Sequence, residues 1–243
     1  MAIVSNTVGY LDGDVLLEGF FAYDDAIENR RPAVMVNHTW VGRNSFVEEK
    51  AIKLAELGYF AFAVDMYGKG VLGQGNEECS ALMQPFMDDR RKVVRRMQAA
   101  LYAVKLFPWV DDKEIAAIGF CFGGLCVLDL ARSNADIKGV VSFHGLLEAS
   151  QVPTQNQTIK AKLLVLCGAD DPMVPAEKLT ALQQELTRAG ADWQTHTYGH
   201  AMHAFTNPAA NDPGFGTVYQ AEADRRSWVA MKSFLRELFN EEN

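Results

Sequence analysis

Short apolar runs alternate along this chain with longer stretches in which apolar residues recur every three or four positions. Runs rich in β-branched and aromatic residues are typical of buried strands, and the longer spacing is typical of helices that bury one face. Strands are predicted over residues 3–10, 15–23, 33–38, 59–65, 114–120, 137–145, 161–169 and 193–199. Helices are predicted over residues 45–58, 79–107, 124–133, 176–190 and 218–238, with a break near Pro85 in the second.

This alternation of strands and helices predicts an α/β fold. Several strands are apolar at nearly every position, which is typical of a mostly parallel central sheet with helices on both faces. The chain has 243 residues, of which 49% are hydrophobic, and no repeat or linker-like stretch divides it. A single α/β domain over residues 1–243 is therefore expected.

Reactive side chains gather at the predicted carboxyl ends of the strands. In a mostly parallel sheet these ends meet at one edge, and ligands bind in the crevice outside it. The residues at these positions are His38, Thr39, Trp40, Asp65, Met66, Tyr67, Cys121, His144, Asp170, Asp171, His200 and His203. The functional site is expected at this edge.

Residues 119–123, with the sequence GFCFG, have the pattern of a nucleophile elbow with cysteine at its centre. A predicted strand precedes the turn and a predicted helix follows it. Such a turn raises the Cys121 side chain into the crevice, and the helix N-terminus favours its thiolate form. The glycines could instead serve only the close packing of strand against helix. Because both flanking elements are present, we prefer Cys121 as a nucleophile.

A nucleophile elbow requires an acid and then a histidine further along the chain. Asp170 and Asp171 follow a buried strand, although an Asp-Asp-Pro string also suits a turn. His200 and His203 follow the last strand, and one of them is expected to be an ordinary loop residue. The order of these residues predicts a Cys-His-Asp triad, in which the imidazole takes the thiol proton and the carboxylate orients the imidazole.

An oxyanion hole is expected beside this triad. One backbone N–H donor would be that of Phe122, the residue after the nucleophile. The other would come from the turn after residues 33–38, at Trp40. Loss of one such donor typically costs about 3 kcal/mol of transition-state stabilisation.

Charge and cysteine content exclude several other classes of function. The net charge is −8, which disfavours nucleic acid and anionic membrane surfaces as partners. No signal peptide or long apolar run is present, so a soluble cytoplasmic protein is expected. Four cysteines without a CxxC pair suit neither a disulfide framework nor a zinc knuckle. Neither a metal ion nor a cofactor is expected, and the oligomeric state is left open.

The motifs PAVMVNHTWVG, AVDMYGKG, IGFCFGG, VVSFHG, GADDPMVP and AMHAFTNP resemble those of the dienelactone hydrolase family, over nearly the whole chain. The resemblance implies an α/β-hydrolase fold and hydrolysis of small carboxylic esters or lactones through a thioacyl-enzyme. It assigns the triad to Cys121, Asp171 and His203. Asp171 is third after Gly168, as the family's acid is, and His203 precedes a small residue and a phenylalanine, as the family's base does.

Two positions depart from the family pattern. Where relatives carry a glutamate that pairs with the thiol, this chain has Thr39, so Cys121 and His203 are expected to be paired already. Where relatives acting on dienelactone carry an arginine, this chain has Thr206 and Asn207. An uncharged ester or lactone is therefore the expected substrate, with activated phosphoesters as a side activity.

The substrate pocket is expected to include Thr39, Tyr67 and His144, with residues 71–87 as part of its wall. Two alternatives come from other classes of protein. One is a small-molecule binding protein that uses the same crevice without turnover, since a fold does not fix a function. The other is a zinc hydrolase that uses His38, His200, His203 and an aspartate, although the spacing of these histidines does not suit zinc.

Overall fold

The computed structural model describes residues 2–150 and 158–240. The strands are β1 (Ile3–Asp12), β2 (Val15–Asp24), β3 (Arg31–Asn37), β4 (Phe60–Ala63), β5 (Val110–Phe120), β6 (Gly139–Phe143), β7 (Lys162–Gly168), β8 (Trp193–Tyr198), β9 (Asn211–Asp212) and β10 (Thr217–Val218). The helices are α1 (Ser45–Ala55), α2 (Gly75–Asp88), α3 (Arg90–Lys105), α4 (Phe122–Arg132), α5 (Ala176–Arg188) and α6 (Ala221–Leu238). Within these residues no helix is long and apolar enough to cross a membrane.

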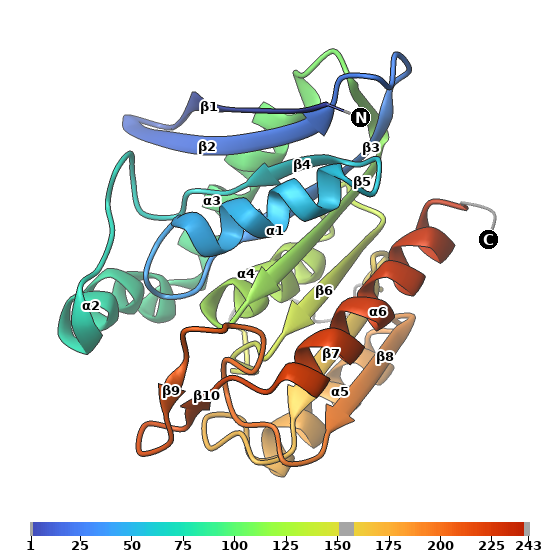
Figure 1. Cartoon of the computed structure of the whole chain (residues 1–243). Helices are drawn as coiled ribbons and strands as arrows, with labels where there is room; N and C mark the ends of the chain where they lie inside the picture. Colours follow the sequence, from blue (N-terminus) through green and yellow to red (C-terminus); the bar gives the residue numbers. More distant parts are fainter. Residues whose placement is uncertain (1, 151–157, 241–243) are drawn as a thin grey trace.

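Strands β1 to β8 form one twisted sheet in the order β1-β2-β4-β3-β5-β6-β7-β8 (Figure 1). Strand β2 runs antiparallel to both of its neighbours, β1 and β4. All the remaining pairs, from β4 through to β8, are parallel. The predicted mostly parallel sheet with helices on both faces is therefore confirmed.

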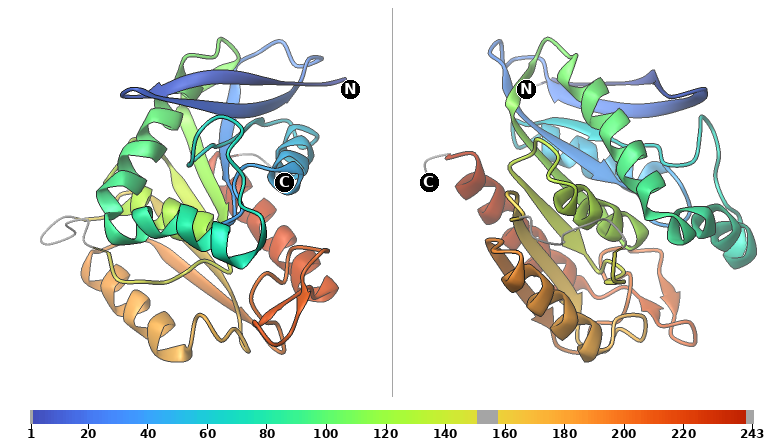
Figure 2. Two further views of the ribbon diagram at one scale, coloured as in Figure 1. Left: turned by 90° about the vertical axis from the view of Figure 1, so that its left-hand side faces the viewer. Right: turned by 180° about the vertical axis from the view of Figure 1, so that it is seen from behind.

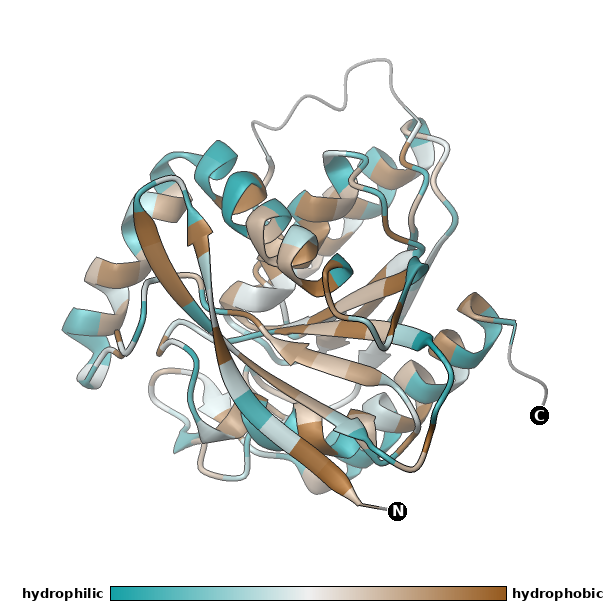
Figure 3. Ribbon diagram, turned by 90° about the horizontal axis from the view of Figure 1, so that it is seen from above, coloured by the Kyte–Doolittle hydropathy of each residue, from teal (hydrophilic) through white to brown (hydrophobic). Residues whose placement is uncertain are grey.

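Different helices cover the two faces of the sheet. Successive side chains of a strand point to opposite faces, so Ala33 and Met35 of β3 pack with residues of α3, α4 and α5. Val34 and Val36 pack instead with residues of α1 and α6. Figure 2 shows these two helical layers from the side and from behind. Figure 3 shows the strands between them coloured mainly as apolar residues, which explains the continuous apolar runs in the sequence.

The predicted interruption of this helical region is present, but it lies at Asp89 and not at Pro85. Helix α2 continues through Pro85 to Asp88, and the chain interrupts the helical pattern at Asp89, which is extended, with φ −132° and ψ 93°. The Asp89 side chain accepts a hydrogen bond from the backbone N–H of Arg91 at 3.2 Å and so caps α3. The helix therefore stops where the next helix acquires a cap, and not where the proline removes one donor.

The prediction for the last helix is also too long at its start. Residues 217–218 form β10, which pairs with β9 in a short antiparallel hairpin, and α6 begins only at Ala221. The hairpin was missed because each of its strands has two residues, too few to produce an alternating pattern. Its turn signal, Pro213-Gly214-Phe215-Gly216, was present in the sequence.

Helix α4, which carries the elbow at its N-terminus, is buried along its whole length. It is held by a network of buried charges. Asp129 accepts hydrogen bonds from Arg90 of α3 at 2.7 Å and from Arg132 at 3.1 Å. Arg132 also donates two hydrogen bonds to Glu185 of α5, at 2.7 and 2.8 Å. The network joins α3, α4 and α5 and so fixes the helix on which the elbow depends.

Two glycines allow α4 to approach the ends of β5 and β3 at the elbow. A Cβ atom on Gly119 would lie 2.1 Å from the carbonyl oxygen of Gly123, and one on Gly123 would lie 2.4 Å from the carbonyl oxygen of Asn37. Both obstacles are backbone atoms, which cannot move aside as a side chain can. The glycines are therefore required by the close approach of strand and helix.

Gly119→Ala is expected to lower the free energy of unfolding by about 1–3 kcal/mol or more, because the added methyl group overpacks a site closed by backbone. Urea unfolding followed by circular dichroism measures this change. Gly199→Ala is the matched control, since nothing lies within 4 Å of its added Cβ. A change of less than about 0.5 kcal/mol is expected for the control, and an equally stable Gly119→Ala protein would contradict the close approach.

Candidate active site

Cys121 lies between β5 and α4 in a strained backbone conformation, with φ 53° and ψ −117°. Few residues other than glycine adopt a positive φ, and such strain persists only where the surroundings enforce it. Here the Cys121 N–H donates to the carbonyl of Phe143 at 3.0 Å, and its own carbonyl accepts from Gly124 at 2.9 Å. The side chain is 9% exposed and lines a cavity. This is the geometry expected of a nucleophile elbow.

His203 and Asp171 are joined by a buried hydrogen bond. His203 Nδ1 donates to Asp171 Oδ2 at 2.7 Å, and both side chains are almost fully buried. Asp171 follows β7, and its other carboxylate oxygen accepts from the N–H of Met173 at 2.8 Å. Because a carboxylate can only accept, the Nδ1 proton is fixed and Nε2 is left for other chemistry.

The β9–β10 hairpin holds the backbone of His203. The His203 N–H donates to the carbonyl of Gly216 at 2.9 Å, and the N–H of Val218 donates to the carbonyl of His203 at 3.0 Å. Sequence reasoning did not find this support, because it joins a loop residue to a hairpin too short to be predicted. The hairpin and the carboxylate together fix both the backbone and the ring of His203.

The surroundings of His203 favour its protonated form. Burial by itself lowers the pKa of His203, but the charge of Cys121 and the hydrogen bond and charge of Asp171 outweigh it and raise the pKa to about 10. His203 Nε2 is buried and makes no hydrogen bond of regular geometry with any described residue. The thiol therefore acts on the ring mainly through charge.

The alternative acid and base lie at the surface. The His200 side chain is 95% exposed and the Asp170 side chain 54% exposed, with 3.8 Å between His200 Nδ1 and Asp170 Oδ2. Neither lines the cavity with Cys121, among the residues that the structure describes. Both Asp–His pairs therefore form, but the pair Asp171 and His203 is buried and reaches the cavity of Cys121 through His203, whereas the pair Asp170 and His200 is exposed.

The residues of the alternative zinc site are not brought together. His38 is fully buried, and both of its ring nitrogens contact the backbone, Nδ1 at Thr39 and Nε2 at Met66. His200 is exposed to solvent, whereas His203 is buried. Over residues 2–150 and 158–240, no three His, Cys, Asp or Glu side chains form a group that could hold a metal ion.

The cavity at Cys121 has a volume of about 670 Å³ and opens at the carboxyl ends of β3, β5 and β7. It is lined by Thr39, Trp40, Val41, Asn76, Met83, Cys121, Leu146, Pro172, Met173, His203, Ala204, Asn207, Ala209, Ala210, Asn211, Asp212, Phe215 and Thr217. Asn76 and Met83 come from α2, as expected of a wall formed by residues 71–87. Among these lining residues the ionisable side chains are Cys121, His203 and Asp212, and none is lysine or arginine.

Of the two residues predicted to form the oxyanion hole, Phe122 follows Cys121 directly in the chain and Trp40 lines the same cavity as Cys121. Phe122 is the first residue of α4, so its N–H has no acceptor within the helix. Trp40 lies in the turn after β3 and lines the cavity. The ring of Phe215, from the β9–β10 hairpin, stacks on the Trp40 ring with centroids 5.5 Å apart. Sequence reasoning missed this contact because it joins residues far apart in the chain.

Of the predicted pocket residues, Thr39 lines the cavity, whereas Tyr67 and His144 are absent from its described lining. The Tyr67 hydroxyl donates to the carbonyl of Trp40 at 2.9 Å. His144 is fully buried behind His203, with ring centroids 5.2 Å apart, and its Nε2 contacts the Thr206 hydroxyl at 2.8 Å. Burial, together with the charge of His203, holds the pKa of His144 well below its usual value, so this ring is neutral. Tyr67 and His144 thus contact two residues of the site, Trp40 and His203, without lining the cavity themselves.

Comparisons with known proteins agree with this geometry. The family model described as "Dienelactone hydrolase family" matches residues 17–239. A dienelactone hydrolase-like promiscuous phosphotriesterase from metagenomic libraries superposes with a TM-score of 0.91 and 39% identity, over 98% of this chain and 99% of that one. An uncharacterised protein of Caenorhabditis elegans is 38% identical over 63% of this chain and 98% of its own.

A putative carboxymethylenebutenolidase of Aquifex aeolicus is 27% identical over 84% of this chain and 87% of its own length. A putative dienelactone hydrolase of Klebsiella pneumoniae, at 19% identity and a TM-score of 0.82, shares the fold. The family model spans most of the sheet and every element that contributes to the cavity. The chain therefore belongs to the dienelactone hydrolase family and is a carboxylic ester hydrolase of the α/β-hydrolase fold.

Proposed function

We propose that the chain hydrolyses small, uncharged carboxylic esters or lactones through a Cys-His-Asp triad. The observation that carries the proposal is the buried hydrogen bond between His203 and Asp171 at the cavity into which the elbow directs Cys121. Nucleophile, base and orienting acid come from three separate turns at the carboxyl edge of the sheet. Such convergence is what a covalent acyl-transfer mechanism requires.

In the first half of the reaction, the Cys121 thiolate attacks the ester carbonyl carbon. The carbonyl oxygen becomes an oxyanion, which accepts hydrogen bonds from the N–H groups of Trp40 and Phe122. The intermediate then collapses to a thioester, and the protonated His203 gives its Nε2 proton to the departing alkoxide. Asp171 stabilises the imidazolium and keeps the His203 ring in the same orientation throughout.

In the second half, neutral His203 accepts a proton from a water molecule as that water attacks the thioester. The tetrahedral intermediate expels the Cys121 thiolate and releases the carboxylic acid. The enzyme returns to a thiolate beside an imidazolium, the state favoured by the raised pKa of His203. No side chain other than the triad needs to change its protonation state.

The replacement of the family glutamate by Thr39 supports a thiol that needs no substrate-triggered activation. Thr39 Oγ1 accepts a hydrogen bond from the N–H of Val41 at 3.4 Å and carries no charge. A threonine hydroxyl cannot hold the thiol proton as a carboxylate can. His203 is then the group that holds this proton at rest and transfers it during turnover.

The cavity favours an uncharged substrate. Leu146, Met173 and Phe215 provide apolar surface, and no lysine or arginine lines the cavity in the part of the chain that the structure describes. Asp212, an exposed residue, places a carboxylate at the wall, where one of its oxygens accepts from the N–H of Phe215 at 3.0 Å. A substrate carboxylate would meet repulsion from Asp212 without a partner to offset it. The anionic dienelactones of related enzymes are therefore poor candidates.

Neutral phosphotriesters are a second class of substrate that the same site could take. The thiolate would attack phosphorus and displace one ester oxygen, which leaves as an alcohol with the proton of His203, and water would then hydrolyse the S–P bond on Cys121. The developing charge on the phosphoryl oxygen would use the oxyanion hole in both steps. The proposal is supported by the 39% identity to a promiscuous phosphotriesterase over 98% of this chain. Phosphate monoesters, which are anionic, should fail for the same electrostatic reason as carboxylates.

Alkylation by iodoacetamide tests the proposed nucleophile. Labelling at pH 7 followed by peptide mapping is expected to modify Cys121 first, with p-nitrophenyl butyrate hydrolysis falling in proportion. The other cysteines are internal controls, because Cys79, Cys126 and Cys167 are buried and burial raises the pKa of each thiol. Hydrolysis that survives complete labelling of Cys121 would refute the thiol mechanism. Tight ligand binding without turnover would instead favour a binding protein.

A further inference from the structure

His38 makes two backbone contacts that fix its protonation and its position. Its Nδ1 lies 2.5 Å from the carbonyl oxygen of Thr39, and its Nε2 lies 3.1 Å from the N–H of Met66. A carbonyl can only accept and an N–H can only donate, so Nδ1 carries the proton and Nε2 accepts. Burial, the largest influence, lowers the pKa of His38 to about 4 and keeps this neutral form. His38 is fully buried and does not reach the cavity.

The carbonyl that His38 holds belongs to the same peptide unit as the N–H of Trp40. A peptide unit is planar, so the direction of its carbonyl determines the direction of its N–H. The hydrogen bond from His38 to Thr39 therefore sets the direction of the Trp40 N–H. This N–H is the expected oxyanion donor on the β3 side of the site.

Tyr67 holds the next peptide unit of the same turn. Its hydroxyl donates to the carbonyl of Trp40 at 2.9 Å, and its ring packs edge-on against His38, with centroids 5.0 Å apart. The two contacts act on consecutive peptide units and so leave the turn little freedom to rotate. The hydroxyl proton is used in this bond and Tyr67 is not among the described residues that line the cavity, so Tyr67 has no donor left for a substrate.

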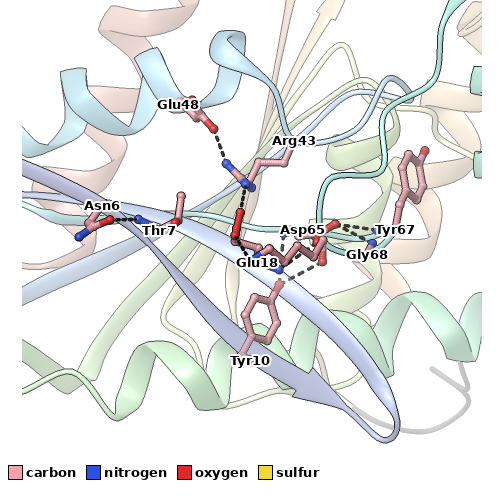
Figure 4. A network of polar contacts seen from close by, with 10 residues as sticks. Asn6, Thr7, Tyr10, Glu18, Arg43, Glu48, Asp65, Tyr67 and Gly68 are labelled. Atoms are coloured by element: carbon pink, nitrogen blue, oxygen red, sulfur yellow. Dashed lines mark hydrogen bonds and ion pairs between the residues drawn. The ribbon is translucent and has the colours of Figure 1, made fainter.

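Asp65, at the end of β4, fixes the turn that carries Tyr67 (Figure 4). One carboxylate oxygen of Asp65 accepts from the N–H groups of Tyr67 and Gly68, both at 2.9 Å, and the other accepts from the N–H of Glu18 at 3.0 Å. The Tyr10 hydroxyl donates to the Asp65 carbonyl at 3.0 Å. A chain of hydrogen bonds thus runs from the β1–β2 hairpin through Asp65 and Tyr67 to the turn beside Cys121.

We infer that His38 and Tyr67 are positioning residues that aim the Trp40 N–H at the oxyanion of the tetrahedral intermediate. The inference rests on the proposed function, since it assumes that Trp40 provides an oxyanion donor. Both residues act through the backbone and touch no substrate. They account for two conspicuous residues at the strand ends, a buried histidine and a tyrosine, that the triad does not use.

The matched pair His38→Leu and His38→Asn tests this inference. Leucine and asparagine have similar shapes and both lose the acceptor for Met66, but the asparagine amide nitrogen can still donate to the Thr39 carbonyl. His38→Leu is expected to lower kcat for p-nitrophenyl butyrate by about 10–100-fold with KM within about twofold, since a donor aimed 1 Å away loses most of its effect. His38→Asn is expected to recover most of this loss.

Tyr67→Phe provides a second test with minimal risk to folding, because it removes only one oxygen. It is expected to lower kcat by about tenfold and to leave KM nearly unchanged, as for a contact that matters in the transition state. Thermal unfolding of all three variants shows whether the fold persists. The rate constant for alkylation of Cys121 by iodoacetamide should match that of the wild type, because alkylation forms no oxyanion.

Each failure has a distinct signature. If His38→Leu and Tyr67→Phe hydrolyse the ester with wild-type kcat while alkylation of Cys121 still abolishes hydrolysis, the positioning role is wrong and the triad stands. Equal losses in His38→Leu and His38→Asn, accompanied by slower alkylation, would also overturn the inference, because they indicate general damage to the site. If wild-type hydrolysis survives alkylation, the proposed function itself fails.

Discussion

Cys121→Ala is expected to lower kcat for p-nitrophenyl butyrate by about 10⁴–10⁶-fold. The proposed reaction passes through a thioester, which alanine cannot form, so that only the oxyanion hole and substrate binding are left to accelerate hydrolysis by water. In a serine protease, loss of the nucleophile costs about 2 × 10⁶-fold in kcat. Steady-state kinetics at pH 7 with purified protein measure the loss, and circular dichroism reports whether the fold is retained.

Cys126→Ala is the matched control for this substitution. Cys126 lies on α4, one turn beyond the elbow, and is fully buried, so its replacement removes a thiol near the site without touching the cavity. Its kcat should stay within about threefold of wild type, with some loss of stability from the small void it creates. Comparable losses of kcat in the two variants would indicate that both thiols matter only for packing, and would contradict the proposal that Cys121 is the nucleophile.

Cys121→Ser tests whether the reaction requires the thiol itself, because it changes the nucleophile and leaves the surrounding residues in place. Serine preserves the size of the side chain, but its hydroxyl does not ionise beside an imidazolium as a thiol does. The variant should fold and should hydrolyse the ester much more slowly than wild type, without a burst of p-nitrophenol. Unchanged kinetics would refute thiolate attack as the first step.

Asp171→Asn is expected to lower kcat/KM by about 10³–10⁴-fold at pH 7. The carboxylate accepts the Nδ1 proton of His203 at 2.7 Å, whereas an asparagine amide can present its own N–H and leave the proton on Nε2. The same substitution in a serine protease costs about 10⁴-fold in kcat. Here the thiolate needs no deprotonation at the moment of attack, so the loss of kcat/KM in Asp171→Asn should not exceed about 10⁴-fold.

The pH dependence of the Asp171→Asn variant has a definite sign. In the wild type, the interactions with Cys121 and Asp171 outweigh burial and raise the pKa of His203 to about 10. Without the Asp171 charge and hydrogen bond the ring releases its proton at lower pH. The pH above which kcat/KM falls, because the imidazolium that protonates the leaving alkoxide is lost, should therefore be lower in the variant than in the wild type. A pH profile of p-nitrophenyl butyrate hydrolysis measures this shift, and a fall at unchanged pH would contradict it.

Asp170→Asn is the control for Asp171→Asn. Asp170 precedes the proposed acid by one residue but is exposed and 3.8 Å from the exposed His200. A change in kcat/KM of less than about twofold is expected, as for a surface charge. A larger loss in Asp170→Asn than in Asp171→Asn would reverse the assignment of the acid.

Much of the fold could be predicted because its signals are local. The strands from β3 to β7 are buried on both faces over most of their length, apart from residues 111–114 of β5, so each contains an apolar run bounded by polar residues. The elbow was recognisable because glycine at 119 and 123 is demanded by backbone contacts on either side of Cys121. These constraints act on neighbouring residues, and the amino-acid sequence records them directly.

Other features could not be predicted because they depend on contacts between distant segments. The sequence pattern left open whether Asp170 or Asp171, and His200 or His203, would face the thiol. The choice lies in how β7 and the loop after β8 meet, which buries Asp171 with His203 and leaves the other pair in solvent. Likewise, Tyr67 was expected in the pocket, but packing turns its hydroxyl to the Trp40 carbonyl.

The amino-acid order alone was thus sufficient for the parallel sheet, the cysteine elbow and the set of reactive residues at the strand ends. Tertiary packing decided which of those residues meet, through the hairpin that holds His203 and the buried His38 that holds Thr39. The reason is physical. Periodicity and turn chemistry report on each residue's nearest neighbours in the chain, whereas a hydrogen bond across the sheet depends on the positions of two backbones that only the folded core brings together.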